Sequence, residues 1–129
     1  MRNVAFTLTD IDLFQGLAES DLEALAQRCR WRRYAPGDQI IEEQDETSDV
    51  FFIASGQVRA TFLSPSGKEV SFRDLGKGKS MGELSAVDGA PRSANVSALT
   101  DAVLGSMPAD VFRVILRDYP DVSTKMMAY

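Results

Sequence analysis

The chain has 129 residues, of which 44% are hydrophobic and 26% charged, as is typical of one globular domain with its own core. Its formal net charge of −5 argues against direct contact between this domain and nucleic acid. A single cysteine and the absence of histidine exclude an internal disulfide and a four-cysteine metal site, and remove the commonest ligand of haem or metal sensors. The sequence shows no membrane-spanning apolar run and no signal peptide, which favours the cytoplasm.

Residues 9–34 predict an N-terminal helical segment. Thr9 or Asp10 is expected to cap a short turn that ends at Gly16. Ser20 and Glu23 form a capping-box pattern, in which each side chain bonds the other residue's main-chain N–H. An amphipathic helix of about ten residues is expected to follow. Its apolar positions at helical spacing are Leu22, Leu25, Ala26 and Cys29, with the thiol packed in the core.

Residues 28–34 are basic, with aromatic side chains between the arginines. This pattern is found in nucleic-acid patches. It also fits a helix C-terminus, where cations are favourable, that continues into a strand with alternating faces. The acidic character of the whole chain favours the second interpretation.

From position 36 to position 107 the hydrophobic period changes to two residues, and turn residues separate short segments, which predicts a sandwich or barrel. The predicted strands contain Ile40 and Ile41, Val50 to Ala54, Val58 to Phe62, Val70 to Arg73, Asn95 to Leu99, and Ala102 to Met107. Turns are predicted at 36–38, 45–48, 55–57, 64–67 and 100–101. In the middle strands, Val58, Ala60 and Phe62 alternate with polar residues, so one face is expected to be buried. Val70 and Phe72 alternate with Ser71 and Arg73 on the return strand.

Gly78-Lys79-Ser80 matches the end of a P-loop, which would indicate a nucleoside-triphosphate site. The first glycine of that motif should stand at position 73, where the chain has Arg73. The segment also lies among short strands rather than in a βαβ unit. A glycine-rich turn is therefore the favoured interpretation.

Residues 108–129 predict two helices. Pro108 suits the first turn of a helix, and Pro120 breaks or restarts it. The apolar stripe of the first helix is Val111, Phe112, Ile115 and Leu116, and that of the second is Val122, Met126 and Tyr129.

Residues 81–98 differ from ordinary loop sequence, because Met-Gly-Glu-Leu opens them and Pro-Arg-Ser-Ala leads back into a strand. Gly82 lets a ligand approach the main chain closely. Glu83 offers a carboxylate suited to a pair of hydroxyls. Arg92 carries a fork of donors that matches a phosphate, and Pro91 stiffens the return. The stretch predicts a ligand with hydroxyls at one end and a phosphate at the other.

These residues resemble the phosphate-binding cassette of cyclic-nucleotide-binding domains, the sensor domains of catabolite-activator-type regulators, cyclic-nucleotide-dependent kinases and cyclic-nucleotide-gated channels. The resemblance covers the chain from about Leu13 to about Leu116. It implies that Glu83, with the Gly82 main chain, binds the ribose 2′-hydroxyl and that Arg92 neutralises the cyclic phosphate. The ligand-binding residues that it implies are Gly82, Glu83, Leu84, Ser85, Pro91, Arg92, Ser93, Ala94 and Asn95. The chain departs from the family at Asp45, where glycine is usual, although aspartate tolerates the left-handed conformation.

The resemblance implies a single domain, mainly β: an eight-stranded antiparallel β-roll of jelly-roll type over 36–107, with the cassette at 81–95 and helices before and after. It also implies a regulatory domain that reversibly binds a 3′,5′-cyclic nucleotide. The expected ligand is cAMP, and cGMP is the alternative because the Asn95 amide can hydrogen-bond either base. Binding would be transmitted through the C-terminal helices, 108–129, expected to be truncated here, to a transcription-regulatory output or partner outside the chain. The chain would then be an excised domain or a small stand-alone protein, monomeric or weakly dimeric.

Three alternatives stay open. Glu83 and Arg92 can form a pair that only braces the loop. A pseudo-sensor would keep the fold as a dimerisation or docking module without binding nucleotide. A phosphodiesterase or nucleotide hydrolase would need a nucleophile–base pair or a metal cluster, and the sequence shows neither, so we expect no catalysis and no prosthetic group.

Overall fold

The structure is a computed structural model that describes residues 6–42, 47–63 and 70–127. The elements in chain order are η1 (Asp12–Phe14), α1 (Glu19–Ala26), β1 (Arg30–Tyr34), β2 (Gln39–Ile41), β3 (Val50–Ser55), β4 (Gln57–Leu63), β5 (Val70–Gly76), β6 (Ser80–Met81), α2 (Glu83–Asp88), β7 (Asn95–Ala98), β8 (Ala102–Met107), α3 (Ala109–Asp118) and α4 (Pro120–Met127).

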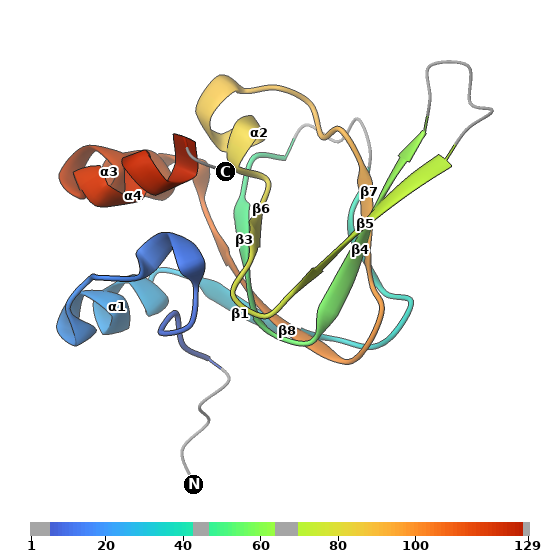
Figure 1. Ribbon diagram of the computed structural model, residues 1–129, viewed down its shortest axis with the longest axis horizontal. Coiled ribbons are helices and arrows are strands. Elements are labelled where there is room, and N and C mark those ends of the chain that lie inside the picture. Colours follow the sequence, from blue (N-terminus) through green and yellow to red (C-terminus); the bar gives the residue numbers. More distant parts are fainter. Residues whose placement is uncertain (1–5, 43–46, 64–69, 128–129) are drawn as a thin grey trace, which may run out of the picture.

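Within the described residues, eight strands form two four-stranded sheets, in the orders β1-β8-β3-β6 and β2-β7-β4-β5. Every strand pair is antiparallel. Figure 1 shows α1, α3 and α4 grouped beside one end of the strands, with α2 near β6. The predicted antiparallel β-roll with flanking helices is confirmed. No helix in the described ranges is long and apolar enough to cross a membrane.

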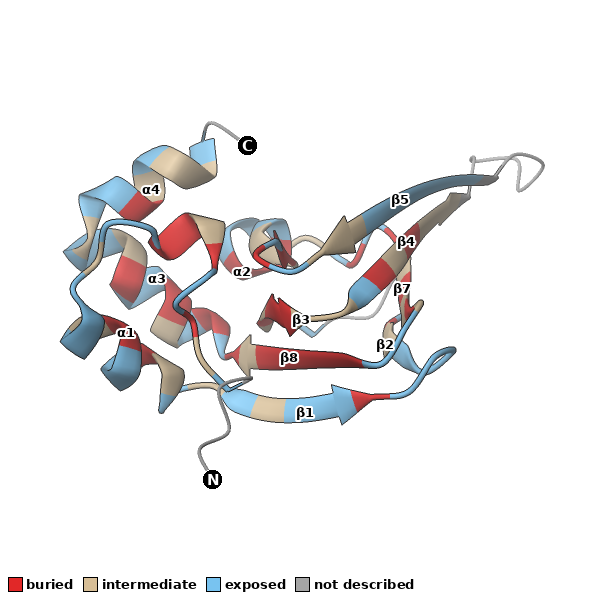
Figure 2. Ribbon diagram, turned by 60° about the horizontal axis from the view of Figure 1, so that its bottom comes forward, coloured by how far each residue is buried: buried red, intermediate tan, exposed pale blue. Residues whose placement is uncertain are grey.

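Two hydrophobic clusters hold these parts together. The first joins the helices to the roll around three fully buried rings, with centroid separations of 5.0 Å for Phe14–Phe52 and 6.4 Å for Phe52–Phe112. The second fills the roll and includes Ile53 and Leu104. Figure 2 shows that β8, which contributes to both clusters, is almost entirely buried.

The N-terminal turn η1 also contacts two distant segments. The Asp12 main-chain N–H donates to the Gly78 carbonyl at 2.8 Å, and Lys79 pairs with the Asp12 carboxylate at 3.1 Å. The Lys125 ammonium of α4 donates to the Gln15 carbonyl. The turn is therefore tied both to the β5–β6 connection and to the last described helix.

The predicted capping box is wrong. Helix α1 begins at Glu19 behind the extended residue Ala18, and no side chain caps it, so Ser20 and Glu23 lie inside the helix. The helix ends at Ala26. Cys29 therefore lies beyond it, yet packs against the first cluster as predicted, and burial raises the pKa of its thiol to about 12.

Residues 30–34 of the basic segment form strand β1, which confirms the predicted strand. Arg32 and Arg33 are exposed, and Tyr34 is buried. Trp31 is anchored by its indole N–H, which donates to the Ala26 carbonyl at 2.9 Å.

In β5 the apolar residue Phe72 lies on the exposed face of the sheet. The register pairs Thr61 with Phe72, and the Phe72 side chain is 60% exposed on the outer surface. There the Arg59 guanidinium lies 4.8 Å from the Phe72 ring centroid and pairs with Asp74 at 2.7 Å. Phe72 thus has a partner outside the core, and the opposite face of β5 carries Arg73.

The glycine-rich segment between β5 and β6 is a turn, as favoured above. Gly78 adopts φ +92°, and its N–H donates to the Ile53 carbonyl at 2.9 Å. The two-residue strand β6 follows it directly, so the strand–loop–helix order of a P-loop is absent from this described segment. Glycine also occupies the left-handed region at the predicted turns 36–38 and 55–57. Predictions for 45–46 and 64–67 lie outside the described residues.

Candidate ligand-binding site

The stretch singled out in the sequence forms a short helix between two glycines. Gly82 (φ +88°) precedes α2 and Gly89 (φ +71°) ends it. A Cβ atom on Gly82 would lie 2.5 Å from the Arg92 Nη1 and 2.8 Å from the Asp49 carbonyl oxygen. Both the positive φ and the close approach therefore require glycine before α2.

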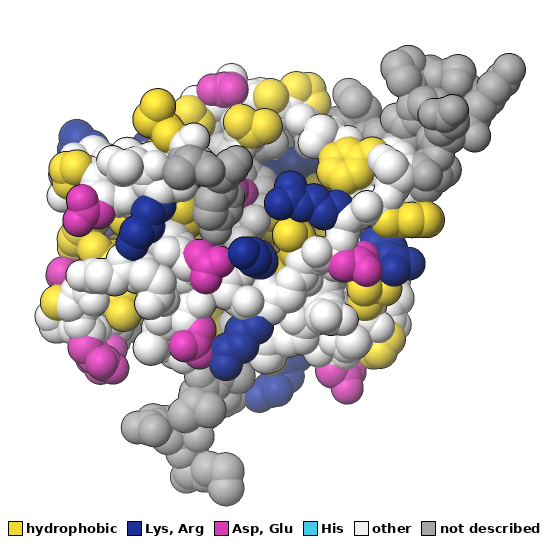
Figure 3. Space-filling model, viewed as in Figure 1, with side chains coloured by type: hydrophobic (Ala, Val, Ile, Leu, Met, Phe, Trp, Pro, Cys, Tyr) yellow, Lys and Arg dark blue, Asp and Glu magenta, His cyan; other side chains and the backbone are white. Residues whose placement is uncertain are grey.

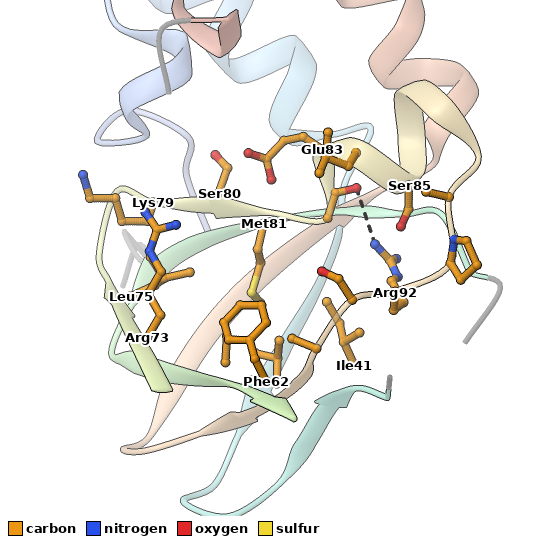
Figure 4. A pocket seen from close by; sticks show the side chains of 18 of the residues that line it. Ile41, Phe62, Arg73, Leu75, Lys79, Ser80, Met81, Glu83, Ser85 and Arg92 are labelled. Carbon is orange, nitrogen blue, oxygen red and sulfur yellow. Dashed lines mark hydrogen bonds between the residues drawn. The ribbon is translucent and has the colours of Figure 1, made fainter. Parts of the chain in front are cut away.

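Arg92 is buried, with 3% of its surface exposed, and hydrogen bonds to earlier parts of the chain fix its orientation. Its Nη2 donates to the Asp49 carbonyl at 2.8 Å, its Nε to the Thr47 hydroxyl at 3.3 Å, and its Nη1 to the Gly82 carbonyl at 3.4 Å. The Phe51 ring centroid lies 5.9 Å from the guanidinium carbon. Figure 4 shows Arg92 at one side of the cavity, bonded to Gly82.

A cavity of about 590 Å³ lies between α2, the following loop, and strands β4, β5 and β6. A volume of this size suits a small organic ligand. Of the residues that the sequence indicated, Gly82, Glu83, Leu84, Ser85, Pro91, Arg92, Ser93 and Ala94 line it. Asn95, which pairs with Thr61 in the sheet, is not among the lining residues.

The cavity has further walls that sequence reasoning did not assign to the site. One is apolar and consists of Ile41, Ala60, Phe62, Leu75, Met81 and Val96, and α4 adds Met126. Another is polar and consists of Arg73, Lys79 and Ser80. The inward alternation of β4 would have identified Ala60 and Phe62. Arg73 could be identified as a lining residue only from the β4–β5 register, which pairs it with the inward-facing Ala60.

Glu83 is half-buried at the first turn of α2. Burial raises the pKa of its carboxyl above the usual value, and its own main-chain N–H and the positive charge of Arg73 oppose this rise. In Figure 4 the carboxylate lies between the guanidinium groups of Arg73 and Arg92. Among the ion pairs of the described residues there is none between Glu83 and Arg92. The alternative that these two side chains pair to brace the loop is therefore not supported.

Two polar features of the cavity concern Lys79 and Ser80. Lys79 is held by Asp12, as described above. The Ser80 Oγ is buried and has no hydrogen-bond partner in the described part of the chain.

Figure 3 shows basic and acidic side chains interspersed over the face seen in Figure 1. No cluster of three or more potential metal ligands occurs among the described residues.

The site is in contact with both C-terminal helices. The Arg113 Nη1 of α3 donates to the Ala86 carbonyl of α2 at 2.6 Å. Met126 of α4 reaches the cavity wall. Helix α2 is therefore bonded directly to α3, and α4 contributes to the wall of the cavity.

Comparison with known proteins agrees with this geometry. The family model of the cyclic nucleotide-binding domain matches residues 31–119. Over 115 residues the chain is 27% identical to a CRP-like cAMP-activated global transcriptional regulator of Mycobacterium tuberculosis. The matched region covers 89% of this chain and 51% of the regulator.

Solved structures show the same likeness. The Thermus thermophilus catabolite activator protein matches with a TM-score of 0.80 and 28% identity, over 90% of this chain and 55% of that protein. The regulatory subunit of a cAMP-independent protein kinase A from Trypanosoma brucei matches with a TM-score of 0.81 and 26% identity, over 95% of this chain and 45% of that one. The chain spans about half the length of the regulators it matches. With residues 31–119 matched by the family model, the chain belongs to the cyclic nucleotide-binding domain family.

Proposed function

We propose that this domain reversibly binds a 3′,5′-cyclic nucleotide, most favourably cAMP, and acts as the sensing part of a regulator. The observation that carries the proposal is the buried Arg92, seated on the main chain beside Gly82, in the wall of a cavity that also contains the Glu83 carboxylate. A guanidinium binds phosphate through charge-assisted, bidentate hydrogen bonds. The Ser93 hydroxyl and the Ala94 N–H would add donors around the same phosphate.

The rest of the nucleotide would follow from the position of the phosphate. Glu83 would accept a hydrogen bond from the ribose 2′-hydroxyl, as an ionised carboxylate is an acceptor only. The base would then lie toward the apolar wall formed in part by Phe62 and Leu75. A purine ring gains free energy from burial against such side chains.

The choice of base depends on less specific contacts. The mycobacterial relative is described as cAMP-activated, whereas the trypanosomal one is described as cAMP-independent. Asn95 does not line the cavity as the chain stands, so its amide would contribute only after a local rearrangement. We therefore expect modest selectivity, with cAMP preferred to cGMP.

We propose transmission through α3 and α4 rather than catalysis. Arg113 connects α2 to α3, and Met126 lies where a bound nucleotide would contact α4. The output would belong to a partner or to a further domain, in the cytoplasm, with the sensing domain monomeric or weakly dimeric. A ligand can shift these helices only by contacting their two arrangements differently.

Isothermal titration calorimetry with cAMP, cGMP and linear 5′-AMP tests the proposal. We expect both cyclic nucleotides to bind more tightly than 5′-AMP, because the proposed binding mode needs a phosphate that is closed into a ring with the ribose. A folded protein that binds none of them would instead be a pseudo-sensor. Chromatography of the nucleotide after incubation would reveal hydrolysis if the domain were an enzyme.

A further inference from the structure

The polar wall opposite Arg92 contains a second guanidinium, that of Arg73, which no motif indicated. Arg73 pairs with Ala60 across the β4–β5 ladder, and both residues line the cavity. Its neighbours Phe72 and Asp74 lie on the outer face with Arg59. Arg73 is thus directed to the cavity by strand alternation, and not to the surface network on the other side of β5.

Within the described part of the chain, Arg73 and Lys79 are the cations of this wall, and they differ in their partners. Lys79 is paired with Asp12, whereas Arg73 makes no hydrogen bond or ion pair with any residue in the described ranges. In Figure 4 the Glu83 carboxylate lies between the Arg73 guanidinium and that of Arg92. Arg73 and Glu83 are not in direct contact, yet the charge of Arg73 lowers the pKa of Glu83 against the effect of burial.

We propose that Arg73 is a positioning residue that supplies the counter-charge for Glu83 and so preserves recognition of the ribose 2′-hydroxyl in mildly acidic conditions. This inference rests on the proposed function and adds a role for a residue outside the cassette. A half-buried carboxylate is costly to keep charged unless a cation faces it. Once protonated, Glu83 loses part of its capacity to accept a hydrogen bond from the sugar.

The other charged groups around Glu83 are already engaged. They are Lys79 from the turn before β6, Arg92 from the loop after α2, and Arg113 from α3, which bind Asp12, the main chain near β3, and the Ala86 carbonyl respectively. Helix α4 contributes the uncharged Met126 to the cavity. Arg92 and Arg113 keep their positive charges, but main-chain carbonyls hold their guanidinium groups in place, so removal of Arg73 would remove the cation whose charge acts on Glu83.

The sign of the pH effect follows directly. Ionised Glu83 accepts a stronger hydrogen bond from the 2′-hydroxyl than protonated Glu83 does, so affinity for the ribose form falls as pH falls through the pKa of this carboxyl. Without Arg73 that pKa is higher, and the loss begins at a higher pH. The 2′-deoxy nucleotide lacks the hydroxyl, so the ratio of its Kd to that of the ribose form isolates the Glu83 contact from general charge attraction.

The experiment is calorimetry of cAMP and 2′-deoxy-cAMP between pH 5.0 and 7.5 on wild type, Arg73→Met, Arg73→Lys and the matched control Arg59→Met. Arg59 lies on the outer face of the same strand pair, so its removal changes the net charge equally. We expect the Kd ratio of Arg73→Met at pH 5.5 to be smaller than that of wild type by about threefold or more, which is roughly 0.65 kcal/mol. Arg73→Lys should restore the ratio, and Arg59→Met should leave it unchanged.

Each other outcome contradicts a definite statement. One such outcome is that wild type discriminates against 2′-deoxy-cAMP while the Kd ratio of Arg73→Met changes with pH in the same way as that of wild type. In that case the counter-charge role is wrong and the proposed function stands. If Arg73→Met changes the preference between cAMP and cGMP but not that ratio, Arg73 contacts the base instead. If wild type binds neither nucleotide, the proposed function fails, and this inference fails with it.

Discussion

The replacement Arg92→Ala should affect folding and binding by separable amounts. Among its hydrogen bonds are one short bond, 2.8 Å to the Asp49 carbonyl, and two long ones of 3.3 Å to the Thr47 hydroxyl and 3.4 Å to the Gly82 carbonyl. Hydrogen bonds from a charged donor contribute about 1.5–3 kcal/mol each, less when they are long. Relief of the desolvation of a buried charge offsets part of this loss. We expect the free energy of unfolding to fall by about 1–3 kcal/mol.

The effect on binding should be larger, since truncation leaves the phosphate without its principal charge partner. A loss on the order of 2–5 kcal/mol corresponds to at least about thirtyfold weaker binding. Arg92→Lys should retain more stability but bind poorly, because an ammonium cannot reproduce the guanidinium fork.

Calorimetry gives the Kd, and urea denaturation without ligand gives the stability. Arg113→Ala is the matched control: it removes an arginine–carbonyl bond to α2 outside the cavity lining, so it should destabilise the fold while cyclic nucleotide still binds. Wild-type affinity in folded Arg92→Ala would refute the assignment of the phosphate site.

Three further predictions concern the same region. Gly82→Ala should lower stability by about 1–3 kcal/mol and weaken binding, because its Cβ would meet Arg92, whereas Gly89→Ala, with nothing within 4 Å, should retain wild-type affinity; equal affinities of both variants would contradict this. Glu83→Gln should weaken binding of cAMP and reduce its advantage over 2′-deoxy-cAMP, and an unaltered advantage in calorimetry would show that Glu83 does not bind the sugar. Hydrogen exchange should show more protection in α3 and α4 with cyclic nucleotide than without, while strands change little; identical exchange with saturating ligand would exclude transmission through these helices.

The fold was accessible from the sequence because its signals are local and repeated. Two-residue alternation in β4, turn residues between strands, and Pro108 before α3 each report the conformation of a few neighbouring residues. The cassette was accessible for a similar reason. A glycine forced to positive φ and an arginine ten residues later are close in the chain as well as in space.

What the sequence could not provide depends on pairing between distant segments. The alternation of Val70 and Phe72 with polar residues does not tell which face of β5 is exposed. Phe72 lies on the outer face beside Arg59, which pairs with Asp74, and this is visible only with the β4–β5 register. The position of Arg73 in the cavity wall likewise depends on that register. The start of α1 was misplaced because Ser20 and Glu23 match a capping pattern that competes with an earlier beginning at Glu19.

The turn η1 implies that the minimal folding unit is larger than the region by which the family is recognised. The family model begins at residue 31, yet Leu8, Ile11 and Phe14 are fully buried against the first cluster. Burial of such side chains contributes roughly 1.5–3 kcal/mol each, and domains of this size are stable by only about 5–15 kcal/mol. An expression boundary drawn at the start of the family match would therefore remove much of the net stability, together with the ties from Asp12 and Gln15 to the β5–β6 turn and α4. A recombinant version of this domain should therefore begin before Leu8.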